Sequence, residues 1–539
     1  MRVDVPNTLS DKLAASLSNL IHKLEEAQPS KPSQIVRLVK EAQVTAADLM
    51  PFADFEHPGT DSYGRRMVYK GANYEIMVMS WNPGDFSAIH DHGYTMWGAV
   101  QIFGRAEHAT FRWEDEHMST LARWVVEEGD VLGVGHSLVH QMGNRDSDPF
   151  VSLHVYGHIN DLDNITGEAR IFDLHNQEVQ RVNGGAFFNL KEDKIVKKEE
   201  GPKADFPTLL RFNLESYKRM ARSNDPFRED YFKTTFSQGN ASKLISHLDS
   251  IISADNQKVN NSIQWKILNR ELREAAEVQA DHETKIGSDD TFHKYAEVYD
   301  EVIGHVSLES FMESYVDFFL KKYDFDLAQN YTLAIGCGTG LVERRIMDKY
   351  GCADESLYGI DISESMISVA KGRIHADVGD LLGLDPGVRK WNLAFSGLNV
   401  YQYLPHQRLE EAIQKTSDIL EEDGYFLGDF ITPDHIRWYP SVMYGADKQV
   451  ISLRTPQLIE DKGASFMESE ILNVHFLDGQ MDVHYAGKHR RFLAPIFRIR
   501  SYFEKHFQKV DLYDAVNLTK VELTDDSCES TRYIVVARK

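Results

Sequence analysis

Residues 84–92 read GDFSAIHDH, and this stretch places His90 and His92 directly after a short apolar segment. In an extended segment, side chains two residues apart point to the same side, so both imidazoles can reach one metal ion. An H-x-H pair on a strand is more often incidental, and alone it is weak evidence of a metal site. A second stretch downstream strengthens the case because it contains Gly129, Asp130, Gly135, His140 and Asn144.

The sequence around both stretches consists of short apolar segments separated by turns. The segments that we expect to form strands are residues 74–81, 96–103, 109–113, 131–134, 151–156 and 186–190. Many short strands at close spacing predict a small all-β barrel or sandwich. Apolar residues at helical spacing between positions 9 and 24 predict a helix that flanks it.

The two histidine-containing stretches together resemble both motifs of the cupin barrel, and residues 40–190 resemble the cysteine dioxygenases. A Ser-Ile-His-Asp-His motif of that family is similar to residues 87–92 of this chain. The resemblance implies that His90, His92 and His140 hold Fe(II). The glutamate that gives many cupins a fourth ligand would fall at Trp97, which implies a neutral three-histidine face with open positions for substrate and oxygen. Some animal members carry a cysteine there that crosslinks to a tyrosine, and Trp97 excludes that crosslink.

Tyr63, Gly64 and Arg65 lie upstream, at the distance where cysteine dioxygenases carry the arginine that binds the substrate carboxylate. The resemblance implies that Arg65 binds this carboxylate through its planar fork and that Tyr63 lies beside the substrate. Arg66 is the alternative if the register is shifted by one residue. Relatives that act on mercaptopropionate tend to lack this arginine, so its presence favours cysteine as the thiol.

Ser152, His154 and Tyr156 occupy alternate positions of a predicted strand. Alternate residues share one face, so a hydrogen-bond relay along that face is available. The resemblance to cysteine dioxygenase implies that Tyr156, positioned by His154 and Ser152, is catalytic and hydrogen-bonds the bound oxygen or substrate. A hydrogen-bonded core triad without a catalytic role is the alternative.

Residues 333–340 read LAIGCGTG, a glycine-rich turn between a predicted strand and a predicted helix. Glycines in this context allow a ligand to approach the backbone closely. Asp361 ends the next predicted strand, where a carboxylate can accept hydrogen bonds from ribose hydroxyls, and Asp380 follows the third. Apolar strands alternate with longer helical stretches, which predicts a parallel α/β sheet; the strands are residues 331–335, 356–360, 393–395 and 425–430.

These signals in order resemble the class I S-adenosylmethionine-dependent methyltransferases, a Rossmann-like fold, over about residues 290–430. The last strands of that fold are expected at residues 509–513 and 533–537. The resemblance assigns the ribose of S-adenosylmethionine to Asp361, the adenine to Asp380 and a closing helix to Tyr295 and Tyr299. It assigns the methionine end of the cofactor to Gly336, Gly338 and Gly340. Ala334 stands where the family usually has an acidic residue, so one contact is missing, and a cofactor fold kept only as a scaffold is the alternative.

The methyl-acceptor pocket is expected in the insertion at residues 432–503. Residues 488–491 read KHRR, a basic run in an otherwise acidic chain. This run is either a solvated face or a wall that binds an anionic sulfinate or carboxylate, to which Arg490 or Arg491 contributes. Asn399, Tyr401 and Tyr403 follow the fourth strand, where acceptors normally bind, but the sequence assigns no base among them.

The chain of 539 residues is long enough for several folding units. We expect a cupin thiol dioxygenase domain at residues 1–200, a helical connector at residues 201–285 and a methyltransferase domain at residues 286–539. Within the connector, helices are predicted at residues 242–252 and 263–278.

The composition excludes several classes of protein. A formal charge of −24 disfavours nucleic acid and anionic membrane surfaces as partners. The odd number of cysteines, Cys337, Cys352 and Cys528, supports neither a disulfide framework nor a cysteine zinc site. No apolar run is long enough to span a membrane. We therefore expect a cytoplasmic protein, whose oligomeric state the sequence leaves open.

The two halves together predict a bifunctional enzyme. It oxidises cysteine with O₂ to cysteine sulfinate at an Fe(II) site, and it methylates the sulfinate, or a derived amine, with S-adenosylmethionine. Its partners are then a small thiol, O₂ and a small methyl acceptor. Two alternatives are a dioxygenase for another thiol whose methyltransferase half acts on a separate metabolite, and a ligand-sensing regulatory protein without turnover.

Overall fold

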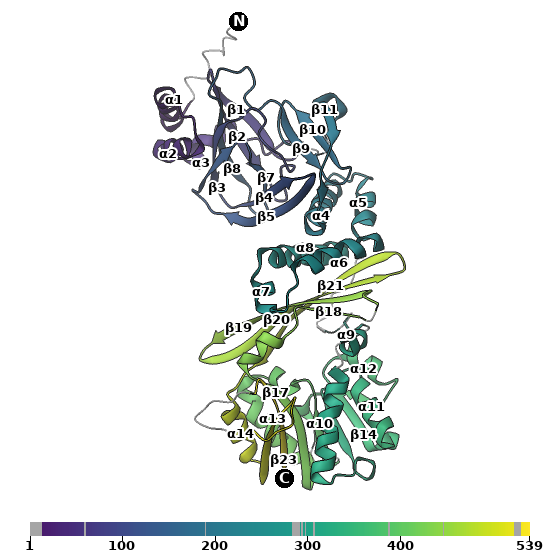
Figure 1. The fold of residues 1–539 in the computed structure, drawn as a ribbon. Coiled ribbons are helices and arrows are strands. Elements are labelled where there is room, and N and C mark those ends of the chain that lie inside the picture. The colour runs from purple at the N-terminus through teal and green to yellow at the C-terminus, as the bar shows by residue number, and fades with distance from the viewer. Residues whose placement is uncertain are drawn as a thin grey trace. The chain divides into compact units, whose positions relative to one another are not determined.

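The computed structural model describes residues 13–58, 61–188, 190–282, 292, 295–296, 298–305, 308–385, 387, 389–445, 447–521 and 530–539. The chain forms two compact units, Met1–His247 and Leu248–Lys539 (Figure 1). Among the described residues, no helix has both the length and the apolar character that crossing a membrane requires. Cys337 and Cys352 carry free thiols, and Cys528 lies outside the described residues.

The first unit is a β-barrel with two main sheets. Its five-stranded sheet has the order β1 (Gly64–Lys70), β2 (Tyr74–Trp81), β8 (Phe150–Gly157), β3 (Trp97–Phe103) and β6 (Val131–Gly135). Its four-stranded sheet has the order β12 (Lys203–Ala204), β5 (His117–Val126), β4 (Ala106–Glu114) and β7 (Val139–Gly143). Side chains from both sheets, such as Val100 and Met142, share one buried cluster that also contains Tyr156, so the inner faces of the two sheets form the core.

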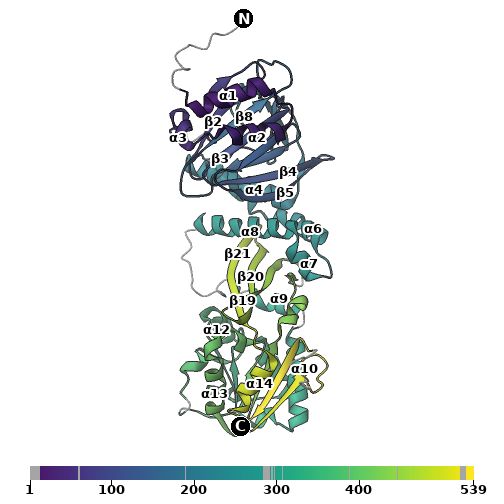
Figure 2. The same cartoon turned by 90° about the vertical axis from the view of Figure 1, so that its left-hand side faces the viewer.

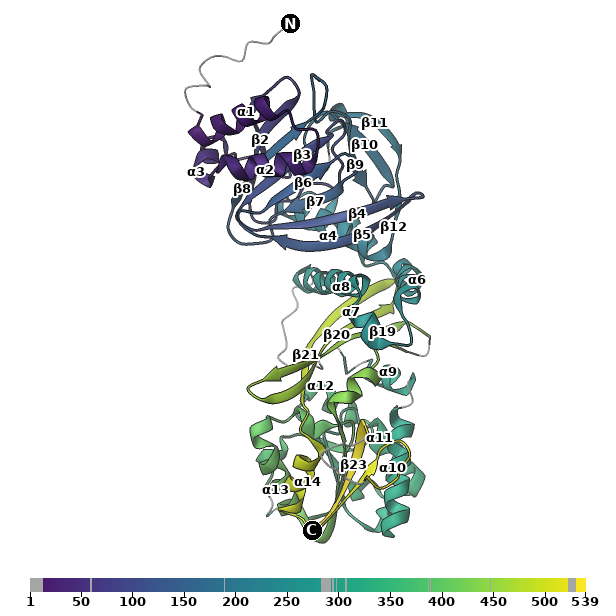
Figure 3. The same ribbon diagram turned by 60° about the vertical axis from the view of Figure 1, so that its left-hand side comes forward.

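Further elements surround the barrel. A three-stranded sheet of β11 (Ile195–Glu200), β10 (Glu178–Val182) and β9 (Ala169–Asp173) lies at one side, and α4 (Phe206–Arg222) packs along β5 (Figure 3). Helices α1 (Ala15–Ala27) and α2 (Pro32–Ala42), with the single turn α3 (Ala46–Leu49), cover the outer face of the five-stranded sheet (Figure 2). The predicted all-β barrel with flanking helices is confirmed.

Most predicted strands of the first unit coincide with β2, β3, β4, β6 and β8. The strand predicted at residues 186–190 is wrong, since residues 186–188 form no strand and residue 189 lies outside the described part. The Ala186 amide donates to the Tyr63 hydroxyl at 2.9 Å, and the Ala186 carbonyl accepts from the Ala88 amide at 2.9 Å. Its backbone groups thus bond to a side chain and a loop instead of a neighbouring strand.

The helices that follow the barrel in the sequence belong partly to the first unit and partly to the second. Helices α4 and α5 (Arg228–Thr235) belong to the first unit, whereas α7 (Asn256–Asn261) and α8 (Ile263–His282) belong to the second. The division between units falls within α6 (Ala241–Ile251). Helices were expected here, but they do not form a body of their own, and the boundaries at residues 200 and 285 stay predictions.

The second unit is built on a seven-stranded sheet. Its order is β15 (His375–Val378), β14 (Leu357–Asp361), β13 (Thr332–Ile335), β16 (Trp391–Ser396), β17 (Leu420–Ile431), β23 (Arg532–Arg538) and β22 (Lys509–Asp514). The strands from β15 to β17 are parallel, and β23 is antiparallel to both of its neighbours. Helices α10 (Leu308–Tyr323), α11 (Leu341–Tyr350) and α12 (Glu364–Ala370) pack on one face, and α13 (Leu409–Ile419) and α14 (Ile496–Glu504) on the other. The predicted Rossmann-like α/β fold is confirmed.

The insertion at residues 432–503 forms a second, antiparallel sheet. Its strands are β18 (Val442–Tyr444), β19 (Val450–Asp461), β20 (Ala464–Leu477) and β21 (Gln480–Phe492). Helix α8 packs against β20 and β21, and Figure 2 shows α8 on the opposite side of this sheet from the Rossmann-like core. The sheet therefore has one face covered by a helix and another that faces the core.

Candidate active sites

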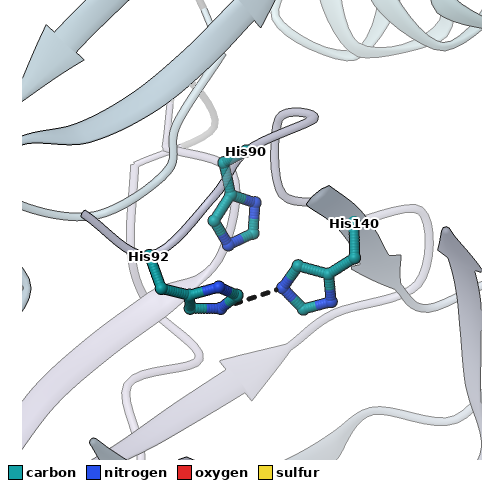
Figure 4. Close-up of side chains that lie close together, drawn as sticks. All are labelled: His90, His92 and His140. Atoms are coloured by element: carbon teal, nitrogen blue, oxygen red, sulfur yellow. Dashed lines mark hydrogen bonds between the residues drawn. The ribbon is translucent and has the colours of Figure 1, made fainter. Parts of the chain in front are cut away.

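Three histidines converge inside the barrel, as Figure 4 shows. His90 and His140 exchange two backbone hydrogen bonds, each 3.0 Å long, which fixes their side chains beside each other. Their ring centroids are 4.6 Å apart, and that of His92 lies 5.1 Å from His90 and 4.8 Å from His140. Asp91, between the two histidines of the H-x-H pair, accepts hydrogen bonds from Arg170 and so holds the loop in place.

The histidine nitrogens are arranged as metal ligands. One nitrogen from each ring lies within 4.8 Å of the others. His90 Nδ1 donates to the Ala88 carbonyl at 2.8 Å, and His140 Nδ1 lies 2.7 Å from His108 Nε2, so both rings turn their Nε2 atoms away from these partners. His140 Nε2 and His92 Nε2 are 3.1 Å apart, close to the roughly 3 Å expected for two nitrogens bonded at right angles to one ion at about 2.1 Å. These residues fit a facially coordinated metal ion.

The protonation states of the histidines also favour a metal. Burial lowers the pKa of His90, and burial together with the neighbouring imidazoles holds the pKa values of His92 and His140 well below the ordinary range. The rings are therefore neutral at physiological pH, which is the form that coordinates a cation.

Ser152, His154 and Tyr156 form the hydrogen-bonded chain that the sequence predicts. Ser152 Oγ lies 2.7 Å from His154 Nε2, and His154 Nδ1 lies 2.8 Å from Tyr156 Oη. The Trp81 indole N–H, which can only donate, points to Ser152 Oγ at 2.8 Å. Burial and the charge of Arg65 lower the pKa of His154 to about 3, so its ring is neutral. The Tyr156 and His92 ring centroids are 5.4 Å apart, which places the end of this chain beside the histidine cluster.

Arg65 and Arg66 point in different directions on β1. Arg66 is exposed and pairs with Asp54 at 3.4 Å. Arg65 is half-buried, donates to Thr166 at 3.3 Å, and acts electrostatically on His154 and Tyr156. The geometry thus favours Arg65 over Arg66 as a residue of this site.

Tyr63 is buried next to the site. Its ring stacks on Trp81 at 4.7 Å between centroids, and its hydroxyl accepts from the Ala186 amide. Burial raises the pKa of Tyr63, so its hydroxyl stays protonated at physiological pH.

The position opposite Tyr156 is Gly98 and not Trp97. In the β3–β8 register, Gly98 pairs with Tyr156 and Trp97 with Gly157. Successive residues of a strand face opposite sides, so the Trp97 side chain packs in the outer cluster beneath α1 and α2. The register inferred from the H-x-H spacing is therefore wrong by one residue at this point, although glycine, like tryptophan, offers neither a carboxylate ligand nor a crosslinking thiol.

His108 is a residue of the first site that the sequence did not indicate. It lies on β4, buried, with its Nε2 against His140 Nδ1. An isolated histidine on a strand carries no motif, and only the pairing of Thr110 with His140 between β4 and β7 brings it to the metal cluster. Its contact orients the His140 ring, a function that partners of metal ligands commonly have.

The second unit contains a cavity of about 500 Å³ at the carboxyl ends of its parallel strands. Gly336 and Gly338 line it with φ values of 68° and 54°, a region that favours glycine. The Gly338 and Ser363 amides donate to the Asp361 carboxylate at 3.0 and 2.9 Å, so Asp361 ties the glycine loop to the next strand at the cavity wall. Gly340, with φ 70°, is the N-cap that precedes α11 and is not among the cavity-lining residues.

Of the other predicted cofactor residues, two tyrosines line the cavity and one aspartate lies on the exposed surface. Tyr295 lines the cavity, and its hydroxyl accepts from Arg454 at 2.5 Å. Tyr299 also lines it, with its ring edge-on to Tyr295 at 5.4 Å between centroids. Asp380 is exposed, accepts from the Leu382 amide at 3.0 Å and does not line the cavity as the structure has it.

The basic run at residues 488–491 lies on β21 and divides between its two faces. Lys488 and Arg490 are exposed and pair with Glu468 and Asp461, whereas His489 and Arg491 are buried and line the cavity. Lys488 and Arg490 thus form the solvated face, and Arg491 lies where an anion-binding wall was expected, whereas the role of Arg491 in anion binding stays a prediction. Alternate residues of a strand face opposite sides, and no pattern in the sequence predicted that this segment is a strand.

Further residues of this cavity carry chemistry that no motif indicated. Arg454 comes from β19 and Tyr439 follows a 3-10 helix at Pro433–Trp438. Glu343, on α11, is a buried carboxyl that lines the cavity and has no hydrogen bond from the side chain of another described residue. A carboxyl thus lies at the cavity although the glycine loop lacks one at Ala334.

Comparisons with known proteins agree with both folds. The cysteine dioxygenase type I family matches residues 3–165, and the methyltransferase domain family matches residues 332–424. Cysteine dioxygenase type 1 of Danio rerio is 27% identical over 158 residues, which is 28% of this chain and 75% of that protein. The Homo sapiens protein is 23% identical over 157 residues, which is 28% of this chain and 74% of that protein. A solved S-adenosylmethionine-dependent methyltransferase from Clostridium acetobutylicum aligns with 18% identity and a TM-score of 0.36, covering 46% of this chain and 98% of that one.

One chain thus combines a cupin barrel that contains a metal-ligand site with a Rossmann-like fold that contains a cofactor cavity. The first unit carries a cysteine dioxygenase type I domain, and the second carries a class I S-adenosylmethionine-dependent methyltransferase domain. The chain is thus an enzyme with an oxidoreductase half and a methyltransferase half, whose cofactors are iron and S-adenosylmethionine.

Proposed function

We propose that the first unit oxidises cysteine with O₂ to cysteine sulfinate and that the second unit methylates this product with S-adenosylmethionine. The observation that carries the first step is the meeting of three neutral imidazoles with the Tyr156 chain and the Arg65 fork in one barrel. In the first reaction both oxygen atoms of O₂ end on the cysteine sulfur, so no reductant is consumed.

His90, His92 and His140 would hold the iron of the first site. Iron held by these residues would supply open coordination positions for the oxidation of a thiol by O₂. The chain's own contribution is orientation: Arg65 binds the carboxylate of the amino acid by a bidentate fork, with Tyr63 beside it, and keeps the sulfur at the metal side. A thiol without a carboxylate loses this contact.

Tyr156 supplies a proton donor beside the cluster. The Trp81 N–H donates to Ser152, so the Ser152 hydroxyl can donate to His154 Nε2. The neutral His154 then carries its proton on Nδ1 and donates to Tyr156 Oη, which leaves the Tyr156 O–H free to point into the site. Burial raises the pKa of Tyr156, so this proton is retained at physiological pH.

In the second unit the cofactor occupies the end of the cavity that the glycine loop lines. Gly336 and Gly338 allow the methionine end to approach the backbone, and Gly340 lets α11 begin directly after the loop. Asp361, at the cavity wall, binds the ribose hydroxyls, and the adenine extends beyond the cavity lining to the exposed Asp380, which accepts from its amino group. Tyr295 closes the cavity over the cofactor.

The chemistry favours oxidation first and methylation second. S-methylation of cysteine would remove the thiolate that the metal site needs, and N-methylation would crowd its amine. A sulfinate is already anionic, and its sulfur lone pair forms the new S–CH₃ bond as the methyl–sulfonium bond of the cofactor breaks. An amine must first lose a proton, which needs a base. S-methylation to a sulfone is therefore favoured over N-methylation.

One incubation tests the whole proposal. The full chain is supplied with Fe(II), cysteine, O₂ and methyl-labelled S-adenosylmethionine, and the products are identified by mass spectrometry and NMR. A labelled methyl on sulfur supports the sulfone, and a label on nitrogen replaces it by an N-methylated sulfinate. If cysteine is oxidised but no labelled product forms, even with added cysteine sulfinate, the dioxygenase step is supported. Cysteine sulfinate would then not be an intermediate that the two units share.

The same assay with cysteamine and mercaptopropionate identifies the thiol. Faster O₂ uptake with either of them than with cysteine would overturn the assignment of cysteine. Absence of O₂ uptake with all three thiols would favour a sensing role without turnover.

A further inference from the structure

The inserted sheet contributes two buried guanidinium groups to the wall of the second cavity. Arg454 on β19 is 7% exposed, and Arg491 on β21 is 8% exposed. Both lie around one aromatic ring, with their Cζ atoms 5.7 and 5.5 Å from the Tyr439 centroid. Two like charges therefore share one part of the cavity.

Neither guanidinium has a counter-ion among the residues that the structure describes. Arg454 donates to the hydroxyls of Tyr295 and Tyr439 at 2.5 and 3.5 Å, and these are phenols. Arg491 stacks on Tyr403 at 4.5 Å, and its Nε and Nη1 atoms are buried with no hydrogen-bond partner in the described chain.

Arg532, which lines the same cavity, shows the contrast. It pairs with the buried Asp429 at 2.6 Å, so its charge is compensated within the protein. Burying an unpaired charge is strongly unfavourable unless an ion or ligand compensates it. Arg454 and Arg491 have no such compensation among the described residues, and a bound anion would provide it.

The other titratable groups at this wall respond to the same positive field. Burial, with the charges of nearby arginines, lowers the pKa of His435 to about 3 and that of His489 to about 4, so both are neutral. Burial opposes ionisation of Tyr439, but the guanidinium groups outweigh it and lower its pKa to about 8. The wall thus has a net positive charge at neutral pH.

We propose that Arg454 and Arg491 form the methyl-acceptor subsite and that the acceptor is a small molecule with two anionic groups, one for each guanidinium. The proposal rests on the proposed function in one respect, that S-adenosylmethionine occupies the end of the cavity at the glycine loop. The cofactor itself is a poor occupant of this wall, because it has a single carboxylate and its ammonium and sulfonium groups are cationic. Cysteine sulfinate has a carboxylate and a sulfinate and matches the pair.

Binding is measured by calorimetry on the metal-free full chain saturated with S-adenosylhomocysteine. The probes are cysteine sulfinate and aspartate, which carry two anionic groups, and hypotaurine and alanine, which each carry one. Cysteine sulfinate and aspartate should bind at least tenfold more tightly than the other two. Arg491→Gln should weaken both dianions by about tenfold to a hundredfold and leave the affinity for S-adenosylhomocysteine within about twofold.

Arg490→Gln is the matched control, because Arg490 is the next residue of the strand but is exposed and pairs with Asp461 at 2.9 Å. It should leave the affinity for every probe within about twofold. Arg491→Lys, which keeps the charge, should retain part of the dianion affinity and serves if the glutamine variant fails to melt cooperatively.

The proposal is overturned if Arg491→Gln binds the dianions as the wild-type chain does, if the one-anion probes bind equally well, or if the wild-type chain binds no dianion. A loss confined to S-adenosylhomocysteine would also overturn it, since Arg491 would then belong to the cofactor. Arg491-dependent binding of cysteine sulfinate that is never methylated would sustain the subsite and refute the proposed substrate.

Discussion

The two active sites differ in how their buried polar groups are satisfied. In the barrel, the ligand histidines His90 and His140 each direct one ring nitrogen to a protein partner, and Ser152, His154 and Tyr156 bond in sequence. In the methyltransferase cavity, guanidinium nitrogens of Arg491 have no partner in the described chain. The buried groups without a partner in the first site are neutral ring nitrogens, His92 Nδ1 and His108 Nδ1, whereas in the second site they belong to guanidinium groups that have no counter-ion among the described residues.

This difference predicts different responses to substitution. Loss of a ligand in the barrel removes the metal and thus all activity of that half, because a facial site has no spare donor. Substitution of a residue in the second cavity changes the affinity for one ligand, and the unit stays folded.

The largest effect is expected from His140→Ala. The substitution removes one of three nitrogen donors, so retained iron should fall from about one equivalent to below about a tenth, and cysteine-dependent O₂ uptake should be lost. Metal analysis and an oxygen electrode measure both. His136→Ala is the control, since His136 is exposed in the same region. Full retention of iron by His140→Ala would show that the ligand set is wrong.

Arg65→Lys should raise the KM for cysteine by about tenfold to a hundredfold, because a lysine cannot replace the bidentate fork. Cysteamine, which has no carboxylate, should be affected by less than about threefold. Arg66→Lys, at an exposed residue paired with Asp54, should leave both thiols unchanged. Equal losses for the two thiols with Arg65→Lys would remove Arg65 from the substrate site.

Asp361→Ala should raise the dissociation constant for S-adenosylmethionine by about one to two decades, each worth about 1.4 kcal/mol. The substitution removes the proposed ribose contact and also the acceptor of the Gly338 and Ser363 amides. Dioxygenase activity should stay within about twofold, since each unit has its own core. Unchanged cofactor affinity would mean that the ribose lies elsewhere.

The elements that the sequence predicted are those whose signal is local. The pattern of short strands and the GCGTG turn after an apolar strand indicated both folds, and the sheet orders agree with them. The ligands His90, His92 and His140 lie together because their motifs fix the backbone of two neighbouring segments.

The residues that the sequence missed depend on long-range pairing. His108 reaches His140 only through the β4–β7 register, and Arg454 reaches Arg491 only because an unpredicted sheet brings β19 and β21 into one wall. The error at Trp97 has a similar cause: the loop between His92 and β3 shifts the register by one residue, and such a shift exchanges the two faces of a strand.

Gly98→Ala tests that register. A Cβ atom at Gly98 would lie 2.8 Å from Tyr156 Cδ1 and 2.7 Å from the Val155 carbonyl oxygen, so the ring or the strand must move. Iron should remain bound, and kcat for cysteine should fall by about tenfold because the Tyr156 hydroxyl is displaced. Trp97→Phe, on the other face, should lower the melting temperature and leave kcat unchanged. A loss of kcat with Trp97→Phe and an unchanged kcat with Gly98→Ala would show that Trp97 faces the site.

The smallest effect is expected from Glu343, and it appears as a dependence of stability on pH. Burial, with a contribution from Asp361, raises the pKa of Glu343 to about 8 from the ordinary 4.5. A raised pKa favours the protonated form in the folded state, so its contribution to stability is full below about pH 4.5 and is lost as the pH rises through about 8. The melting temperature of the ligand-free second unit should therefore fall by several degrees between pH 6 and 8.5, and Glu343→Gln should flatten this slope.

S-adenosylmethionine should also flatten the slope, because its ammonium group can pair with the Glu343 carboxylate and stabilise the ionised form. The transition to follow in the full chain is the one that S-adenosylhomocysteine shifts upward, which assigns it to the second unit. Glu364→Gln, at an exposed position of α12, is the control and should leave the slope as in the wild-type chain. If Glu343→Gln keeps the full slope, a group other than Glu343 titrates in this range. The proposed pairing of the Glu343 carboxylate with the cofactor's ammonium group would then be wrong.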